Sequence, residues 1–303
     1  MQLRVVAMSS KGFIEIEPHT LHKYNILKKY LNVCKIFDKH YSNFVYVDTH
    51  GGSGKVCFKR KKEKWVDGSP LIAANWTPSF ACQIVEINPE RFKNLCESTK
   101  GCSNVNTHHG DCNKLIGAIL KKIQKGRKFV FCFVDPDSLV YRGSGSAICD
   151  QVCADTIRTI ANFPRTELLL NFPLESILRC AGDYYKYPSE PRAIANGERV
   201  TIFMGSTGWQ GLPEKDRNRR GFLELYMEEM LKNYHYKGAI LIRSEKNNLP
   251  LYYLMYTTHN PTAAKIMRDI MKKEGDFPLY YNMDTGRPQT LDEVYPLTRF
   301  IFE

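Results

Sequence analysis

Acidic residues follow four successive predicted strands of this chain. The strands cover 44–47, 81–85, 105–109 and 129–134, and the acids that follow them are Asp48, Glu86, Asp111 and Asp135. Short apolar runs, of which 105–109 is the weakest, predict buried strands of a parallel sheet. The carboxyl ends of parallel strands meet at one edge of the sheet, where open α/β folds bind their ligands. The sequence therefore predicts one crevice into which these carboxylates converge.

A glycine-rich turn follows the first of these strands. It reads Asp48-Thr49-His50-Gly51-Gly52-Ser53-Gly54. Glycine permits positive φ and lets a ligand approach the backbone. Glu86 can accept both hydroxyls of a ribose, and Asp111 could accept an adenine amino group. The predicted nucleoside-cofactor site consists of Asp48, His50, Gly51, Gly52, Gly54, Glu86 and Asp111. The plainer alternative is an ordinary tight loop with strand-end acids that coincide by chance.

The interval 55–67 separates this turn from the helix predicted at 69–75, where Ser69 is a capping residue and Pro70 takes the first helical position. In dinucleotide-binding folds the ribose-binding acid follows the turn by about 20 residues, and here the separation is longer. We expect the interval to displace the helix N-terminus from the usual phosphate position. That expectation speaks against a pyrophosphate cofactor such as NAD.

Strands alternate with helices through most of the chain. Further helices are predicted at 18–41, 89–99, 113–124, 149–162, 221–233 and 261–274, a fifth strand at 167–172, and a hairpin from 238–243 and 251–257 around 246–248. This order predicts an α/β fold with a doubly wound, mostly parallel sheet, a late antiparallel hairpin and a helical insertion. Residues 1–172 and 221–303 would form the α/β domain, and 173–220 an inserted segment of short helices and loops.

The charge is strongly basic. The 303 residues carry 43 Lys and Arg against 32 Asp and Glu, a net charge of +11, which attracts nucleic acid or another anionic partner. The candidate nucleic-acid residues are Lys59, Arg60, Lys61 and Lys62, in a basic loop beside the glycine turn, and Arg217, Arg219 and Arg220. Trp65, which follows the loop, could stack a base. Solvated charges on a mobile loop are the alternative.

Other sequence features narrow the class of protein. No apolar run reaches the ~18 residues of a membrane span, and the N-terminus lacks a signal-peptide pattern, so we expect a cytoplasmic protein. The ten cysteines lack the paired spacing of a zinc site and are expected to be buried thiols, with no metal bound. Cys149 and Cys153 could share a helix face as a metal or redox site, which is the less favoured reading.

With these residues in place, the chain resembles class I S-adenosylmethionine-dependent methyltransferases. The Asp48 turn resembles their first motif, Glu86 their ribose-binding acid, Asp111 their adenine-side acid and Asp135-Pro136 their catalytic-loop motif. The late hairpin resembles their sixth and seventh strands. The resemblance implies a Rossmann-like methyltransferase fold and S-adenosylmethionine as cofactor.

More narrowly, the chain resembles the three-Cys-motif partner proteins, called TcmP. The stretches that carry this resemblance are 22–31, 47–54, 68–73, 134–136, 170–172 and 252–259. The chain departs from that family at His50 and Ser53, where a small residue and a proline are expected, and at Asp137-Ser138, where Phe-Gly is more usual. The implied partner is a separate three-Cys-motif protein that looks like an iron–sulfur radical enzyme.

A methyl transfer would need alignment more than covalent chemistry. Asp135 could accept an N–H of an amine or ring nitrogen, and the Pro136 carbonyl could accept a second. Asn171, at the end of the fifth strand, is a secondary catalytic candidate, and the slightly favoured alternative is a turn residue bonded to its own backbone. We expect a methyltransferase acting on nucleic acid. The alternatives are a non-catalytic adaptor on the same fold, or another kind of nucleic-acid processing.

Overall fold

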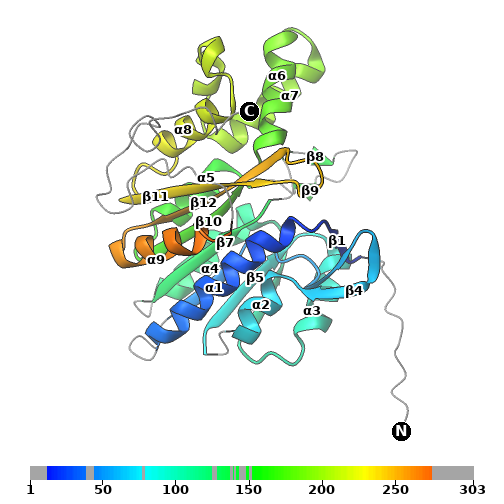
Figure 1. Cartoon of the computed structure of the whole chain (residues 1–303), viewed down its shortest axis with the longest axis vertical. Coiled ribbons are helices and arrows are strands. Elements are labelled where there is room, and N and C mark those ends of the chain that lie inside the picture. The colour runs from blue at the N-terminus through cyan, green and yellow to red at the C-terminus, as the bar shows by residue number, and fades with distance from the viewer. Residues whose placement is uncertain are drawn as a thin grey trace.

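The centre of the molecule is a seven-stranded sheet with the order β11-β12-β10-β7-β2-β5-β6 (Figure 1). The computed structural model describes residues 12–38, 44–76, 79–124, 128–136, 139, 141–142, 148–149 and 152–274. The strands of the sheet are β2 (Phe44–Asp48), β5 (Ala81–Glu86), β6 (Val105–His109), β7 (Phe129–Val134), β10 (Thr166–Phe172), β11 (Tyr236–Arg243) and β12 (Pro250–Thr258). Each of the predicted strands is therefore present, within one or two residues of its predicted ends.

The sheet reverses its winding at β2. This strand pairs in parallel with β5 on one side and with β7 on the other. The chain runs outward from β2 through β5 to β6, then returns to β7 and continues to β10. In open α/β sheets, ligands bind at such a switch point, outside the carboxyl ends of the strands. The topology thus places the predicted crevice at the ends of β2 and β7.

The late hairpin is antiparallel, as predicted. Strand β12 lies between β10 and β11 and runs opposite to both. Residues 244–249 connect β11 to β12, and a connection this short can join only antiparallel neighbours. The four remaining neighbouring pairs in the sheet, β10-β7, β7-β2, β2-β5 and β5-β6, are all parallel, which confirms a mostly parallel sheet.

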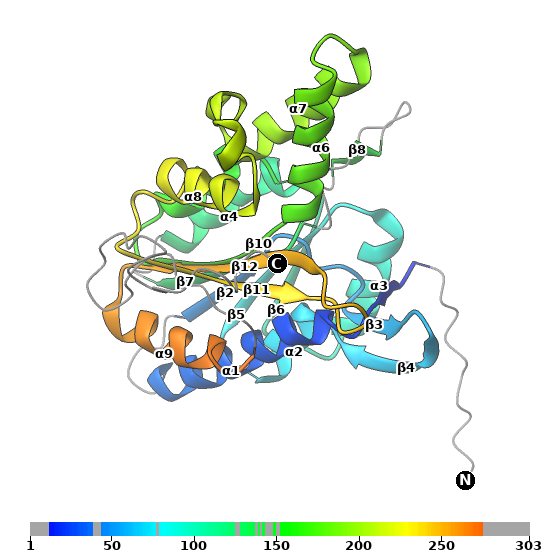
Figure 2. The same cartoon turned by 45° about the horizontal axis from the view of Figure 1, so that its top comes forward.

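Helices cover both faces of the sheet (Figure 2). They are α1 (Thr20–Asp38), α2 (Ser69–Trp76), α3 (Pro89–Thr99), α4 (Cys112–Gln124), α5 (Ala154–Ala161), α6 (Leu174–Lys186), α7 (Pro191–Met204), α8 (Arg219–Glu229) and α9 (Pro261–Met271). Helices α1, α2, α3 and α9 bury their apolar sides in one core cluster, and α4 to α8 bury theirs in the other. The sheet is doubly wound, and its strands are apolar on both faces because both faces are covered.

The inserted segment differs from its prediction. Helices α6 and α7 have 13 and 14 residues, so the segment is more regular than short helices and loops. It also ends earlier, since α8 begins at Arg219. Trp209, in the 3-10 helix Gly208–Gly211, is fully buried and packs edge-on against Tyr184 and Tyr185. Its indole N–H donates to Thr201 Oγ1 at 3.0 Å. The segment therefore belongs to the core on one face of the sheet.

The helix predicted from Cys149 is wrong at its start. Residues 148–149 form the short strand β9, paired with β8 (Tyr141–Arg142). Helix α5 begins only at Ala154, and Cys153 is its N-terminal flanking residue. The two cysteines therefore share no helix face. Among the described residues, no cluster of three or more His, Cys, Asp or Glu side chains could hold a metal ion.

A second, smaller sheet replaces the predicted basic loop. Its order is β1-β3-β4, with β1 (Ile14–Ile16) parallel to β3 (Lys55–Phe58) and β3 antiparallel to β4 (Lys61–Asp67). The Gly68 N–H donates to the Gly54 carbonyl at 2.7 Å, which closes the hairpin at its base. A Cβ at Gly68 would lie 2.8 Å from the same carbonyl oxygen, so only glycine fits there. Helix α2 consequently begins beside the glycine turn, and the expected displacement of its N-terminus is wrong.

Within the described part of the chain, none of the helices combines the length and the apolar character needed to cross a membrane.

Candidate functional site

A cavity of about 610 Å³ opens at the carboxyl ends of β2, β5 and β7. The predicted cofactor and catalytic residues that line it are His50, Gly51, Gly52, Glu86 and Asp135. Five others are not among its lining residues: Asp48, Gly54, Asp111, Pro136 and Asn171. The strand ends therefore meet around one hollow, but only part of the predicted set reaches its surface.

The glycine turn is held against the neighbouring strand by its own backbone. Gly51 N–H donates to the Val85 carbonyl at 2.8 Å. A Cβ at Gly51 would lie 2.3 Å from Ile84 Cγ2, which is closer than packed carbons can come. Gly52 takes φ +63° and its N–H donates to Glu86 Oε2 at 2.8 Å. These positions require glycine because of the close approach and the left-handed backbone.

Glu86 is the carboxylate that joins the turn to β5. It is 3% exposed, and its two oxygens accept N–H groups from Gly52 and, at 2.7 Å, from Asn88. Backbone donors on both oxygens fix the orientation of the carboxylate at the wall of the cavity. Asn88 also caps helix α3, accepting from the N–H groups of Glu90 and Arg91. Arg91, in the first turn of that helix, lines the same cavity.

Asp48 lies beneath the turn and is fully buried. Its carboxylate accepts from the Tyr46 hydroxyl at 3.0 Å and from the His50 N–H at 3.1 Å. Burial raises the pKa of Asp48 to about 7, against hydrogen bonds from Ser69, the His50 N–H and Tyr46 that lower it, while the nearby charge of Asp135 raises it further. Because Ser69 is the first residue of α2, Asp48 ties the turn to that helix.

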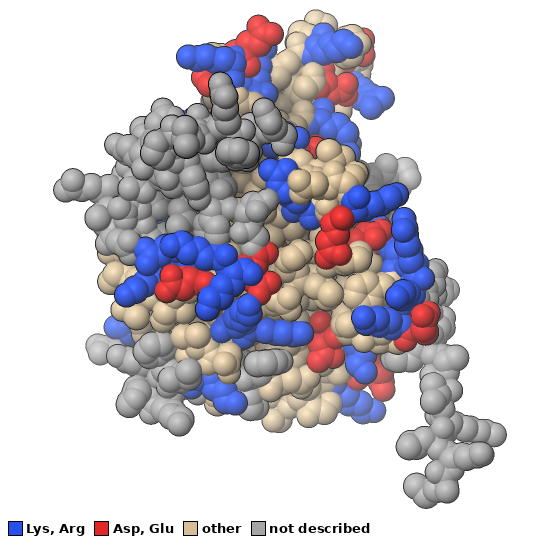
Figure 3. Space-filling model, viewed as in Figure 1, with Lys and Arg blue, Asp and Glu red and all other residues tan. Residues whose placement is uncertain are grey.

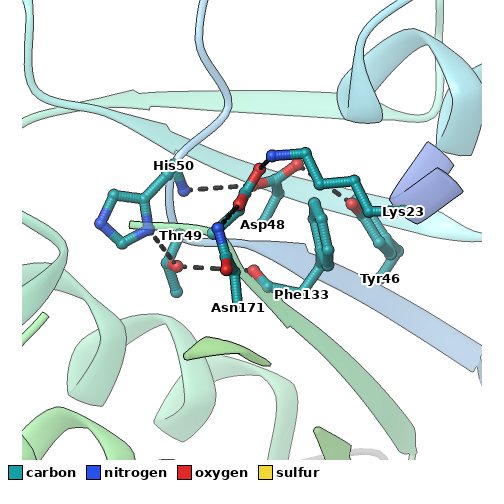
Figure 4. A network of polar contacts seen from close by, with 8 residues as sticks. Lys23, Tyr46, Asp48, Thr49, His50, Phe133 and Asn171 are labelled. Atoms are coloured by element: carbon teal, nitrogen blue, oxygen red, sulfur yellow. Dashed lines mark hydrogen bonds and ion pairs between the residues drawn. The ribbon is translucent and has the colours of Figure 1, made fainter. Parts of the chain in front are cut away.

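Asp135 follows β7 and receives a cation and an amide from distant parts of the chain. These partners are Lys23 and Asn171, which Figure 4 shows within one network of polar contacts. Asp135 Oδ2 lies 2.5 Å from Lys23 Nζ, and Asp135 Oδ1 accepts from Asn171 Nδ2 at 2.8 Å. The side chains of Lys23 and Asp135 are 11% and 12% exposed, and both residues line the cavity. Asn171 lies within β10, so its alternative reading as a turn residue is wrong.

Lys23 is a site residue that the sequence analysis missed. It lies near the start of α1, 112 positions before Asp135. Nothing in the local pattern separates it from the other lysines of that helix. Asn171 also contributes an unused acceptor beside Asp135. Its Oδ1 is buried and has no hydrogen-bond partner among the described residues. Pro136 is buried.

Asp111 serves as the cap of α4. Its Oδ1 accepts from the Asn113 N–H at 2.9 Å, and its carbonyl accepts from Leu115 N–H at 3.1 Å. An aspartate in this position satisfies donors that the helix itself leaves unpaired. Its neighbours Gly110 and Cys112, and not Asp111 itself, are the residues that line the cavity here.

The His50 ring lies between two polar side chains on the cavity wall. Its Nδ1 is 2.7 Å from Thr49 Oγ1, and its Nε2 is 4.0 Å from Cys112 Sγ. The Thr49 hydroxyl also donates to the Phe133 carbonyl at 3.4 Å. These contacts connect the turn after β2 to β7 and to the start of α4.

The N-terminal segment closes one side of the cavity. Phe13 to Glu17, together with His19, Thr20 and Tyr24, line it. Strand β1 is held against the turn, because Ile14 N–H donates to Ser53 Oγ at 3.3 Å. A strand of three residues is too short to show a periodic pattern, so this wall could not be predicted from the sequence.

The two predicted basic clusters lie far apart, on the β3–β4 hairpin and at the start of α8 (Figure 1). On the hairpin, Lys59 forms an ion pair with Glu17 at 3.6 Å and lines the cavity. Arg60 is in the turn and Lys61 begins β4, whereas the Lys62 side chain lies outside the described part of the structure. Trp65 packs edge-on against Phe13 at 4.8 Å between ring centroids.

The arginines of the second cluster have partners within the protein. Arg219 lies 3.4 Å from Glu175 and Arg220 lies 2.9 Å from Glu224. The Arg217 guanidinium stacks 4.0 Å from the Tyr185 ring centroid. None of the three is among the residues that line the cavity.

Comparison with known proteins bears on the fold. Neither a family model nor a curated protein matches the chain. Among solved structures, it is similar to protein LPL1258 from Legionella pneumophila str. Philadelphia 1, which carries the family description DUF519, with 12% identity and a TM-score of 0.50 over 82% of this chain and 89% of that one. The N-methyltransferase NodS from Bradyrhizobium japonicum WM9 gives 7% identity and a TM-score of 0.39 over 80% and 98%. The sheet order and the likeness to LPL1258 assign the chain to a Rossmann-like α/β fold with a mostly parallel sheet.

Proposed function

We propose that this protein is an S-adenosylmethionine-dependent methyltransferase. One observation carries the proposal: the glycine turn, Glu86 and Asp135 line a single cavity at the switch point of the sheet. A nucleoside cofactor needs a carboxylate for its ribose and close backbone approach for the rest of the molecule. A methyl transfer also needs a polar side chain that orients the acceptor, and Asp135 is the candidate for that side chain. All three requirements meet in this cavity.

The residues fit the cofactor. Glu86, oriented by two backbone N–H groups, would accept the ribose hydroxyls. Gly51 and Gly52 leave the turn without side chains, so its backbone can face the ligand. The Gly110 and Cys112 positions would border the adenine, with Asp111 shaping that wall through its helix cap. The cofactor supplies an already activated methyl group, and the protein aligns the acceptor with it.

Asp135 would orient the acceptor. Asn171 and Lys23 fix its two carboxylate oxygens at the cavity wall, which keeps the group from rotating away. A second lone pair on each oxygen can accept an N–H from an amine or ring nitrogen.

The acceptor we propose is a nucleic acid, with a three-Cys-motif protein as partner. The basic hairpin beside the cavity and the net charge of +11 support the first. The sequence resemblance to the three-Cys-motif partner family supports the second. The competing function is an adaptor that keeps the cofactor fold without transfer. The engagement of both Asp135 oxygens within the protein favours that reading.

Calorimetry with S-adenosylmethionine and S-adenosylhomocysteine tests the cofactor. Glu86→Ala should weaken binding by at least about tenfold, because it removes the ribose acceptor and the anchor of Gly52. Glu198→Ala, which alters an exposed glutamate on α7, should bind as the unchanged protein does. Absence of binding at millimolar ligand would overturn the cofactor. Binding without methyl incorporation into cellular RNA or DNA, with the three-Cys-motif protein added, would favour the adaptor.

A further inference from the structure

A second groove adjoins the cofactor cavity. It has a volume of about 850 Å³ and lies between the β3–β4 hairpin and the turn that joins β11 to β12. Ile16, Glu17, His19 and Lys59 line both hollows, and Pro18 lines only the groove. The two hollows therefore share a rim, and a ligand in one can extend into the other.

The groove is strongly basic. Its cations are Lys59, Arg60, Lys61, Lys64 and Lys246, and its carboxylates are Glu17 and Glu245. Four of the cations come from the hairpin and one from the β11–β12 turn, so they belong to segments about 190 positions apart in the chain. Figure 3 shows Lys and Arg side chains gathered over the β3–β4 hairpin, with acidic side chains interspersed.

Three of these cations are open to a ligand. Arg60, Lys61 and Lys246 are exposed, and none of them forms an ion pair with any residue in the described part of the chain. Lys64 lies over the Phe58 ring, 5.1 Å from its centroid, and Lys59 faces Glu17. The arginines at the start of α8 differ, because Arg219 and Arg220 are already neutralised by their glutamates. Arg217, the third arginine of that cluster, stacks on the Tyr185 ring, so the hairpin cluster offers more unpaired cations than the cluster at α8.

We infer that the groove binds the phosphodiester backbone of a single-stranded nucleic acid whose target base enters the cofactor cavity. A row of exposed cations on two turns matches a row of phosphates. The shared rim lets one nucleotide leave the groove while its neighbours remain in it. A base stacked in a duplex cannot reach a carboxylate such as Asp135 within a cavity wall. The entry of the base into the cofactor cavity rests on the proposed function. The binding of the nucleic-acid backbone in the groove does not depend on it.

Fluorescence anisotropy of labelled single-stranded RNA and DNA of about 20 nucleotides measures this binding without cofactor. The variant is the triple change Arg60→Gln, Lys61→Gln and Lys246→Gln. The matched control is Lys121→Gln, Lys122→Gln and Lys232→Gln, three exposed lysines at the end of α4 and after α8. Both variants lose three positive charges, so a difference between them reports position and not net charge.

The groove variant should bind at least about tenfold more weakly, and the slope of log affinity against log salt should fall by about 2. The control should retain nearly all of its affinity. The RNA and DNA arms decide which backbone is preferred. Equal losses in both triple variants, unchanged binding in the groove variant, tighter binding of duplex than of single strands, or full competition by polyglutamate would each overturn the inference.

Calorimetry with S-adenosylmethionine on the same variants separates this inference from the proposed function. Arg60, Lys61 and Lys246 line the groove but are not among the residues that line the cofactor cavity, so the groove variant should keep its cofactor affinity. Suppose that neither the unchanged protein nor the variants bind cofactor, but the groove variant still loses affinity for nucleic acid. The groove inference is then supported and the methyltransferase proposal is wrong. If cofactor binds and the groove variant loses nothing, the reverse holds.

Discussion

Lys23 Nζ lies 2.5 Å from Asp135 Oδ2, across 112 positions of sequence. The pair joins the first turns of α1 to the end of β7, and Asn171 holds the second oxygen of the same carboxylate from β10. Helix α1, the end of β7 and strand β10, which are far apart in the sequence, are therefore joined by polar contacts at the wall of one cavity. The pair is nearly buried, so removing one partner leaves a charge without compensation.

Lys23→Met should lower the free energy of unfolding by about 3 kcal/mol, because it leaves the Asp135 carboxylate unpaired in a nearly buried position. Urea denaturation measures the change. Lys35→Met, at an exposed position of the same helix, should cost little. Adding Asp135→Asn to Lys23→Met should recover part of the loss. Equal effects of the two lysine changes would show that the ion pair contributes nothing.

The titration of Asp48 should make stability depend on pH. Its folded-state pKa of about 7 lies above the ordinary value of 3.8, so between these values the folded protein binds a proton that the unfolded chain has lost. Stability from this group is thus fully present below pH 3.8 and is lost as pH rises through about 7. Relative to Asp48→Asn, the unchanged protein should lose stability from about pH 4 to about pH 7 and then level off.

The control for that experiment is Asp155→Asn, which alters a carboxylate whose side chain is 91% exposed. Denaturant unfolding of all three proteins across the pH range gives the differences. A difference between the unchanged protein and Asp48→Asn that is flat from about pH 5 to about pH 8 would contradict the raised pKa.

Gly52→Ala should destabilise the protein by about 1–2 kcal/mol, since φ at this position is left-handed and the new Cβ would lie 2.6 Å from Ile14 Cδ1. Gly117→Ala is its counterpart. Gly117 lies within α4 with no atom near the site of a Cβ, so alanine there should stabilise by about 0.5–1 kcal/mol. Thermal unfolding compares the two, and a Gly52→Ala protein as stable as the unchanged protein would show that the turn does not require glycine.

Tyr30 supports a buried carboxylate at the opposite end of the sheet. Its hydroxyl donates to Glu167, which also accepts from Thr258 at 3.1 Å, and burial raises the pKa of Glu167. Tyr30→Phe removes one donor from a buried acceptor and should cost about 1–3 kcal/mol in unfolding free energy. Tyr187→Phe, at a ring that is 40% exposed, should cost less than about 0.5 kcal/mol. A Tyr30→Phe protein as stable as the control would mean that Glu167 finds another donor.

Several elements were predictable because their information is local. The runs 44–47, 81–85 and 129–134 are apolar throughout, and this pattern fits only a strand covered on both faces. The need for glycine after β2 is fixed by backbone geometry within a few residues. Such signals also suffice to place strand-end acids at one edge of the sheet.

The depth of each acid was not predictable. Asp48, Glu86 and Asp111 look alike in sequence, each following a strand. In the structure one supports the turn from below, one lines the cavity and one caps a helix. These roles depend on which donor comes within reach, and the donors belong to Tyr46, Gly52 and Asn113. Strand register and loop path decide that, and neither is encoded by a local pattern.

By itself, the sequence determined the alternation of strands and helices, the winding of the sheet and the position of the glycine turn, because periodicity and turn chemistry act between near neighbours. Only the tertiary structure decided that β1 would pair with β3, that Lys23 would reach Asp135, and that the β11–β12 turn would bring Lys246 to the hairpin groove. Those contacts join segments whose separate patterns carry no mark of one another. They form when helices and loops pack closely against both faces of the sheet, because close packing brings segments that are distant in sequence into contact.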